Sequence, residues 1–294
     1  MQRFKQYFYT DWSFYKRMLA ITIPIALQNV ISLGVNMMDT IMLGQLGDVA
    51  IASANLGGQL FTILDVVGFG LASGAAVLIA QYWGKRDMLR IRQIFALTLR
   101  VVLVVSSLFA LVGHFLPRQV LAIYTNDPAV IASGAEYLKL LSISFVLFSF
   151  SNCYIMCLRA VEQVRISMVV YGCSFFINVF FNYCFIFGNF GAPALGVTGA
   201  AIATLIARVV EIVIVVVHAR RSRVFRLDLG LLLRPGLRTV KQFIRYGSPV
   251  VCNETMWGLG TTVMTSILGH MTDSADMLAA YTIMGNIDKF STVA

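Results

Sequence analysis

Charged side chains are scarce in this sequence. Only 13% of its 294 residues are charged, whereas 58% are hydrophobic, and the mean hydropathy is +0.79. A soluble globular chain carries roughly a quarter charged residues. No single core could remove this much apolar surface from water, so the sequence predicts that most of it faces lipid.

Signatures of several other protein classes are missing. The three histidines are scattered, and there is no His-Glu-x-x-His metal motif, no Gly-rich phosphate loop and no Gly-x-Gly-x-x-Gly dinucleotide loop. We therefore expect neither an enzyme nor a protein driven directly by ATP, and we expect no cofactor. The five cysteines lie in apolar stretches without a zinc spacing or a disulfide framework, so we expect all of them to be buried as small apolar residues. The first residues lack the apolar region and cleavage site of a signal peptide, so we expect the first span to be retained.

Apolar stretches long enough to cross a bilayer as helices recur along the chain. We predict eight spans, at 18–43, 52–82, 93–116, 134–158, 166–188, 195–217, 243–270 and 277–294. The segments between them alternate between strongly basic and weakly charged. The positive-inside rule therefore predicts a multi-pass protein of the plasma (inner) membrane with a cytoplasmic N-terminus. The net charge of +9 reflects this topology, and we expect no nucleic-acid partner.

The beginning of the chain is repeated near its end. Five residues recur at one constant spacing, namely Lys16, Pro24, Thr40, Gly44 and Asp48 as Lys241, Pro249, Thr265, Gly269 and Asp273. Six spans separate the copies, so both copies enter the membrane in the same direction. We predict an all-α polytopic bundle with a first lobe at 1–217, a cytoplasmic basic linker at 218–241 and an incomplete second lobe at 242–294. The chain is therefore expected to be a fragment of two like-oriented six-helix lobes.

Asp39 is the acid of the first span. A charge at mid-membrane costs about 2.5–3.5 kcal/mol, so its presence calls for a reason. Asn36 precedes it by one turn and Gln28 lies deeper, which predicts a polar lining for a substrate cavity. A desolvated carboxylate there can take up a proton or bind a cation. The alternative is a carboxylate at the interface that only reaches water.

Glu254 and Asp65 are further acids within the predicted spans. Glu254 follows Pro249, whose ring frees a backbone carbonyl, and the pair indicates a second coupling site that could hold Na⁺. The alternative is a shallow glutamate paired with Arg245 or Lys241. Asp65 in the second span either lines the cavity or pairs with a neighbouring helix.

Polar residues at helical spacing mark two further spans. Asn178 and Asn182 share a face, so they either join helices or line the cavity beside Asp39. Arg208 and Glu211 are expected to pair with each other. The small residues from 70 to 74 predict close packing between helices.

Several motifs resemble one known family, the multidrug and toxic compound extrusion (MATE) transporters. They are Val-Asn-Met-Met-Asp-Thr-Ile-Met-Leu-Gly at 35–44, Ile-Ala-Gln-Tyr-Trp-Gly-Lys at 79–85, the Asn178 to Gly188 segment, and Pro193 with Gly196-Val-Thr-Gly-Ala-Ala. The resemblance covers nearly all of the chain. It implies twelve spans in two lobes and efflux of organic cations in exchange for Na⁺ or H⁺.

The resemblance also assigns roles to single residues. Asp39 matches the first-span acid implicated in proton coupling, and Asn178 matches the fifth-span asparagine. Asn182 stands where some proton-coupled members have an aspartate. Glu254 is similar to the seventh-span acid of sodium-coupled members but lies about one turn nearer the proline.

These observations predict a secondary active multidrug efflux antiporter whose two lobes rock between inward and outward cavities. Its expected partners are drug-like organic cations and the lipid bilayer, and we expect a monomer. One alternative is a lipid-linked oligosaccharide flippase of related architecture, which a cavity ringed by arginines would favour. Another is an inactive truncated membrane protein.

Overall fold

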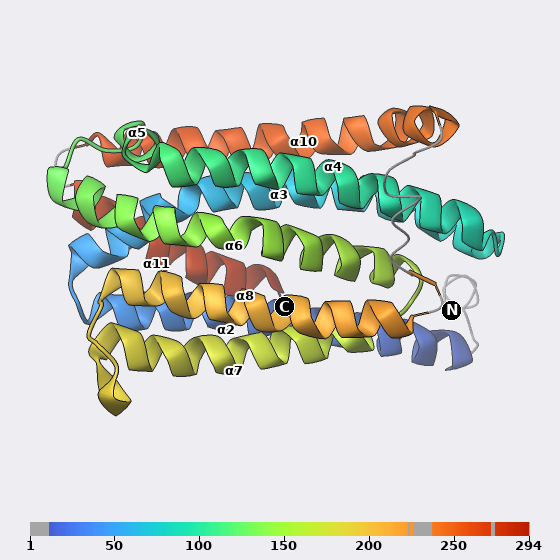
Figure 1. Cartoon of the computed structure of the whole chain (residues 1–294), viewed down its shortest axis with the longest axis horizontal. Coiled ribbons are helices and arrows are strands. Elements are labelled where there is room, and N and C mark those ends of the chain that lie inside the picture. The colour runs from blue at the N-terminus through green and yellow to red at the C-terminus, as the bar shows by residue number, and fades with distance from the viewer. Residues whose placement is uncertain (1–11, 223, 226–236, 272–273, 294) are drawn as a thin grey trace, which may run out of the picture.

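The structure is a computed structural model that describes residues 12–222, 224–225, 237–271 and 274–293. These residues form long helices that run side by side (Figure 1). The elements are α2 (Trp12–Gly44), α3 (Asp48–Gly84), α4 (Met88–Phe115), α5 (Pro117–Ala122), α6 (Pro128–Ala160), α7 (Arg165–Phe187), the 3-10 turn η1 (Asn189–Gly191), α8 (Val197–Arg221), α10 (Leu237–Gly269) and α11 (Ser274–Val293). No strand occurs within the ranges just given, and the all-α prediction is confirmed.

The bundle has two chemically different ends. We call one the basic end, because the turns after α3 and α6 and the last turn of α8 gather there with Lys85, Arg86, Arg90, Arg165, Arg220 and Arg221. Both α2 and α10 begin at this end, on the right of Figure 1, and both run to the opposite end. The two copies of the repeat therefore point the same way, as the sequence predicts.

Six helices are long and apolar enough to cross a membrane. They are α2, α3, α4, α6, α7 and α8, in a search restricted to the described residues. The spans predicted at 243–270 and 277–294 do form α10 and α11, but neither is among the six. The body of α10 contains Glu254 together with several threonines and glycines, which lower its mean hydropathy.

Helix caps explain where the helix ends differ from the predicted spans. The Asp127 side chain accepts hydrogen bonds from the Ala129 and Val130 amides at 2.8 and 3.5 Å, and Pro128 occupies the first turn. The α6 helix therefore begins at Pro128, well before the predicted 134. The short α5, which was not predicted, also has a proline, Pro117, in its first turn but lacks a side-chain cap.

The basic end has an aromatic core that includes residues beyond α8. Phe225 is fully buried, and its ring lies 5.1 Å from that of Phe95 and 6.2 Å from that of Tyr154. Phe243 near the start of α10 belongs to the same cluster. Half of the predicted linker at 218–241 lies outside the described residues, and the domain boundaries stay a prediction. Its described beginning nevertheless packs into the first lobe.

The contact between α3 and α10 depends on glycines. A Cβ on Gly74 would lie 2.7 Å from the Cα of Gly247, and one on Gly70 would lie 2.9 Å from the Cα of Val251. Such distances leave no room for a side chain, so the backbones approach closely. We call this contact the glycine seam (Gly70, Gly74 and Gly247). It confirms the packing predicted for residues 70 to 74.

All five cysteines are free thiols. Cys153, Cys157 and Cys184 are buried in the bundle, as expected of small apolar residues. Cys173 and Cys252 are exposed, so the expectation that every cysteine is buried is wrong for these two. They lie on outward faces of α7 and α10, where lipid or a further helix can cover them.

Candidate functional site

Asp39 belongs to a chain of hydrogen bonds that joins three helices. Asn182 Nδ2 of α7 donates to Asp39 Oδ1 of α2 and, at 3.0 Å, to Asn178 Oδ1. Asn178 Nδ2 in turn donates to Thr204 Oγ1 of α8 at 3.3 Å. We call these four residues the Asp39 network. The structure thus brings together Asp39, Asn178 and Asn182, three of the residues that the sequence marks as site candidates.

The local structure of α7 and α8 positions the network. Asn178 and Asn182 lie one turn apart on the buried face of α7, at 2% and 0% exposure. Gly188 ends α7 in the left-handed region with φ 75°, and the Leu195 amide donates to Phe185 O at 2.8 Å. This tight connection returns the chain antiparallel to α7 and places Thr204 opposite Asn178.

The donors and acceptors of the network fit a small hard cation or a proton. The half-buried Asp39 supplies the negative charge, and the amide and hydroxyl groups supply neutral oxygens. Asn182 Oδ1 is buried without a hydrogen-bond partner among the described residues. This oxygen is therefore free to coordinate a cation. Hard cations prefer such oxygen ligands. Where the structure is described, no group of three or more His, Cys, Asp or Glu gathers for a metal.

Tyr137 of α6 lies near the network and was not predicted as a site residue. Its phenol is within electrostatic range of Asp39. A Cβ on Gly57 of α3 would lie 2.7 Å from Tyr137 Cδ1, so the absence of a side chain at Gly57 admits the ring. Neither Tyr137 nor Thr204 carries a charge, and both residue types are ordinary in membrane helices. Their place at the site depends on packing that helical spacing does not reveal.

A second group of polar residues lies deeper in the lobe. Arg208 and Glu211 of α8 form the predicted ion pair, with Nη1 and Oε1 2.7 Å apart. The Arg208 guanidinium also lies 4.7 Å from the centre of the Phe148 ring. Asp65 of α3 accepts a hydrogen bond from Asn152 Nδ2 of α6 at 3.5 Å, so it contacts a neighbouring helix.

The remaining candidates are not in the hydrogen-bonded chain. Gln28 is 1% exposed, and its Oε1 has no hydrogen-bond partner in the described part of the chain. Asn36 is exposed on α2. Glu254 lies on α10, where its Cβ would be 3.5 Å from a Cβ on Gly70. In Figure 1, α10 lies at the other edge of the bundle from α7 and α8, so the structure does not gather the two predicted coupling acids in one site.

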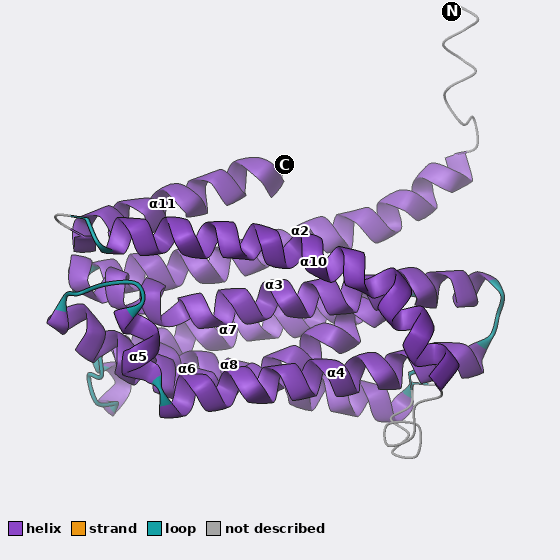
Figure 2. Ribbon diagram, turned by 90° about the horizontal axis from the view of Figure 1, so that it is seen from above, coloured by secondary structure: helices purple, strands orange, loops and turns teal. Residues whose placement is uncertain are grey.

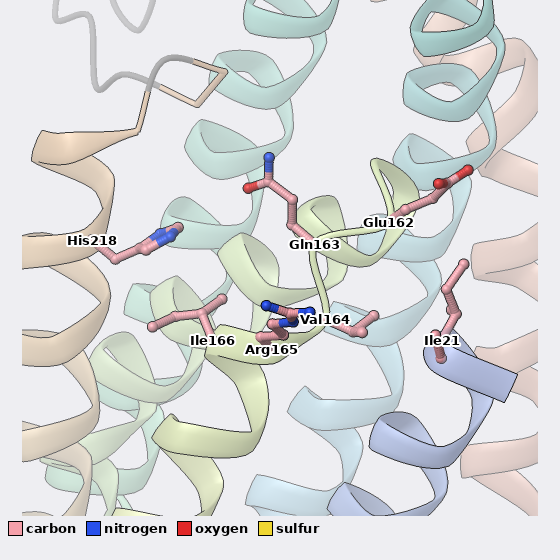
Figure 3. A pocket seen from close by; sticks show the side chains of 8 residues that line it. Ile21, Glu162, Gln163, Val164, Arg165, Ile166 and His218 are labelled. Carbon is pink, nitrogen blue, oxygen red and sulfur yellow. The ribbon is translucent and has the colours of Figure 1, made fainter. Parts of the chain in front are cut away.

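A pocket of about 500 Å³ opens at the basic end (Figure 3). It lies between the early part of α2, the turn from α6 to α7 and the end of α8. Its lining comprises Ala20, Ile21, Glu162, Gln163, Val164, Arg165, Ile166 and His218. Asp39 lies near the other end of α2, so this pocket is separate from the Asp39 network.

Comparison with known proteins places the chain among transporters. The MatE family model matches residues 24–184, which is more than half of the chain. The sequence is 28% identical over 277 residues to the "Probable multidrug resistance protein NorM" of Thermotoga maritima, which covers 94% of this chain and 59% of that relative. It is 24% identical over 283 residues to the "Probable multidrug resistance protein YoeA" of Bacillus subtilis, which covers 95% of this chain and 60% of that relative.

Solved structures share the fold. The "MATE multidrug transporter DinF-BH", solved in complex with a ligand, superposes with a TM-score of 0.84 at 21% identity, over 95% of this chain and 61% of that one. A second structure, described as an outward-facing MATE family transporter, gives 0.71 at 20% identity, over 95% and 67%. The present chain spans about 60% of the length of its relatives NorM and YoeA. By the family model and by its fold, this chain belongs to the MatE family of multidrug and toxic compound extrusion transporters.

Proposed function

We propose that the chain supplies the first lobe and the beginning of the second lobe of a multidrug efflux antiporter. In this proposal the transporter exports drug-like organic cations in exchange for Na⁺ or H⁺, and the coupling ion binds at Asp39. The named relatives are multidrug resistance proteins, and DinF-BH is a multidrug transporter whose structure contains a ligand. These likenesses support the substrate class for this chain.

The observation that carries the proposal is the Asp39 network. A carboxylate within a span is costly unless it binds something, and here its nearest donor is an amide that also presents an unpartnered oxygen. Asn182 is neutral, so a proton site shared by two carboxylates is not formed at this position. The oxygen set favours Na⁺ at this site, with a proton on Asp39 as the second candidate.

The proposed mechanism is competition between the ion and the drug. Hydrogen bonds tie Asp39 of α2 to α7 and, through Thr204, to α8, so an ion bound at Asp39 acts on all three helices. A change in ion occupancy alters how these helices meet, and the lobes rock between inward and outward cavities. Glu254 remains a proposed second coupling position with Na⁺ as its candidate ion, at the contact between α10 and α3.

The flippase alternative is not favoured. An anionic lipid-linked saccharide calls for a cavity lined by free cationic groups. Arg208 of α8 is paired with Glu211, and Asp39 and Asp65 are acids within electrostatic range of it. This arrangement suits a cationic cargo.

We further propose that the protein lies in the plasma membrane with its basic end in the cytoplasm, and that the complete transporter is a monomer. The support is the gathering of Lys and Arg at a single end of the bundle. Such residues are retained on the cytoplasmic side during insertion.

Drug efflux in cells stripped of their own exporters tests the proposal. The complete product of the gene is expressed, and retention of a fluorescent organic cation is measured with and without a Na⁺ or H⁺ gradient. We expect gradient-dependent efflux from the unaltered protein and little or none from Asp39→Asn. The variant keeps the size of the side chain but removes the charge that binds the ion.

Asp48→Asn is the matched control. Asp48 undergoes the same chemical change, but it is exposed at the start of α3, outside the network. We expect its efflux to match that of the unaltered protein. Equal efflux from Asp39→Asn and Asp48→Asn would remove Asp39 from the mechanism. No efflux from the unaltered protein would support the inactive-protein alternative.

A further inference from the structure

We propose that the balance of charge within the Arg208–Glu211 pair controls how tightly Asp39 holds its cation, because either charge without its partner shifts the binding. The inference rests on the proposed ion site at Asp39 and adds positioning residues that do not themselves bind the ion. The pair lies on α8, the helix that contributes the last member of the Asp39 network.

Arg208 is close to the network along α8. Thr204, which accepts the hydrogen bond from Asn178, lies one helical turn before Arg208 on the same face. The Arg208 charge interacts electrostatically with Asp39 of α2 and with Asp65 of α3. The guanidinium is therefore a fixed positive charge within reach of the proposed cation site.

The surroundings of Arg208 hold its charge in place without fully neutralising it. One carboxylate, Glu211, receives a hydrogen bond from Nη1 at 2.7 Å, and the ring of Phe148 lies 4.7 Å from the guanidinium carbon. Arg208 Nε is buried without a hydrogen-bond partner among the described residues. The two side chains are 17% and 3% exposed, so little water screens their fields.

The two opposite charges of the pair largely cancel at Asp39. What remains is the difference between the electrostatic effect of Arg208 and that of Glu211. Removal of the Glu211 charge leaves the Arg208 cation uncompensated, which repels any cation bound at Asp39. Removal of the Arg208 charge leaves the Glu211 anion, which attracts it. Removal of both restores a neutral pair. The same signs hold for Na⁺ and for H⁺, because both carry one positive charge.

Other groups also face Arg208, and they stay constant in this comparison. They are Asp65 of α3, Asp39 of α2, and Tyr171 of α7, which in turn interacts with Arg159 of α6. Tyr137 of α6 interacts with both Asp39 and Arg208. A shift that follows the charge at 208 and 211 is therefore attributable to the pair.

Carbodiimide labelling of Asp39 measures occupancy without transport. Dicyclohexylcarbodiimide modifies a protonated carboxyl group in an apolar site, so bound Na⁺ or loss of the proton protects it. The complete protein is purified, and the Asp39 peptide is quantified by mass spectrometry against pH and against Na⁺ concentration. Asp39→Asn identifies the labelled residue.

We expect opposite shifts for the two single variants. Glu211→Gln weakens Na⁺ protection and moves the labelling midpoint to lower pH, and Arg208→Gln does the reverse. Each shift is on the order of tenfold, as expected when one charge in the low-dielectric interior of the lobe loses its partner. The double variant Arg208→Gln/Glu211→Gln and the conservative Arg208→Lys stay near the unaltered protein. The double variant also covers the case in which Arg208→Gln fails to fold with Glu211 unpaired.

The outcomes separate this inference from the proposed function. Unchanged midpoints in Glu211→Gln, with normal Asp39 labelling in the unaltered protein, would overturn the role of the pair alone. Shifts of the same sign in both single variants would also overturn it, since they indicate a structural disturbance. Labelling of Asp39 that responds neither to pH nor to Na⁺ would overturn the proposed ion site and this inference with it.

Discussion

Asn182 contributes to the site in two ways that a single substitution removes together. Its amide nitrogen donates to Asp39 and to Asn178, and its oxygen lacks a partner among the residues described. A hydrogen bond to a charged group contributes about 1.5–3 kcal/mol. We therefore predict that Asn182→Ala weakens Na⁺ binding by roughly 10- to 100-fold, as measured by calorimetric titration of the purified protein.

Asn189→Ala is the control for that substitution. Asn189 begins the 3-10 turn after α7, and its side chain donates to Tyr183 O at 3.4 Å, outside the network. We expect Na⁺ binding to be unchanged in this variant. Equal losses in Asn182→Ala and Asn189→Ala would point to a general loosening of α7 and would argue against direct contact with the ion.

At this scale the sequence predicted the charged members and the paired amides of the site. Asp39, Asn178 and Asn182 are polar groups in apolar spans, and the spacing of the two asparagines puts them on one face. Thr204 and Tyr137 were missed because their roles arise from contacts between separate helices. Asn36 lies one turn before Asp39 and is exposed on α2, so its place in a substrate cavity stays a prediction.

At the scale of helices, the glycine seam fixes how near α10 comes to α3. Gly74→Ala would bring a Cβ to 2.7 Å from the Cα of Gly247, and backbone on both sides must move. Overpacking of this kind typically costs about 1–3 kcal/mol. We predict that the variant has a lower unfolding temperature in detergent and a weakened contact between α3 and α10.

Gly58→Ala provides the comparison on the same helix. A Cβ at Gly58 meets nothing within 4 Å. Both substitutions gain the same helix propensity, about 0.5–1 kcal/mol, so the difference between their unfolding temperatures reports the seam alone. Equal unfolding temperatures for Gly74→Ala and Gly58→Ala would contradict the prediction, because they would show that the close contact between α3 and α10 does not contribute to stability.

The extents of single helices were partly predictable. Apolar length located all eight predicted spans, and each corresponds to a helix. The helix ends were less accurate, because apolar length ignores caps such as Asp127, which extends α6 into polar sequence. The pairing of α3 with α10 was not predicted, although the small residues that permit it were recognised.

At the scale of the molecule, the bundle ought to present its two ends to different compartments. Lys85 is exposed at the basic end and Asp48 at the opposite end. In a background without the native cysteines, we predict that Asp48→Cys reacts with an impermeant maleimide in intact cells. Lys85→Cys is expected to react only after the membrane is opened. The reverse labelling would invert the proposed orientation.

The whole-molecule architecture could be predicted because lipid imposes a strict rule. Backbone polar groups must be satisfied within each span, so apolar stretches of sufficient length become helices. The repeat then gave the common direction of α2 and α10. The position of α10 against the first lobe could not be predicted in this way, because it depends on which small surfaces meet.

The glycine seam also bears on how the lobes can move. Interdigitated side chains hold packed helices in register. Glycines have no side chains, so they cannot interdigitate with the neighbouring helix in this way. In Figure 2, α10 runs alongside α3 for much of its length. Translation of α10 along α3 at this contact therefore needs little free energy. Separation of the two helices needs more, because it exposes closely packed backbone. In the proposed transporter, the first helix of the second lobe is therefore suited to shear against the first lobe by sliding along α3.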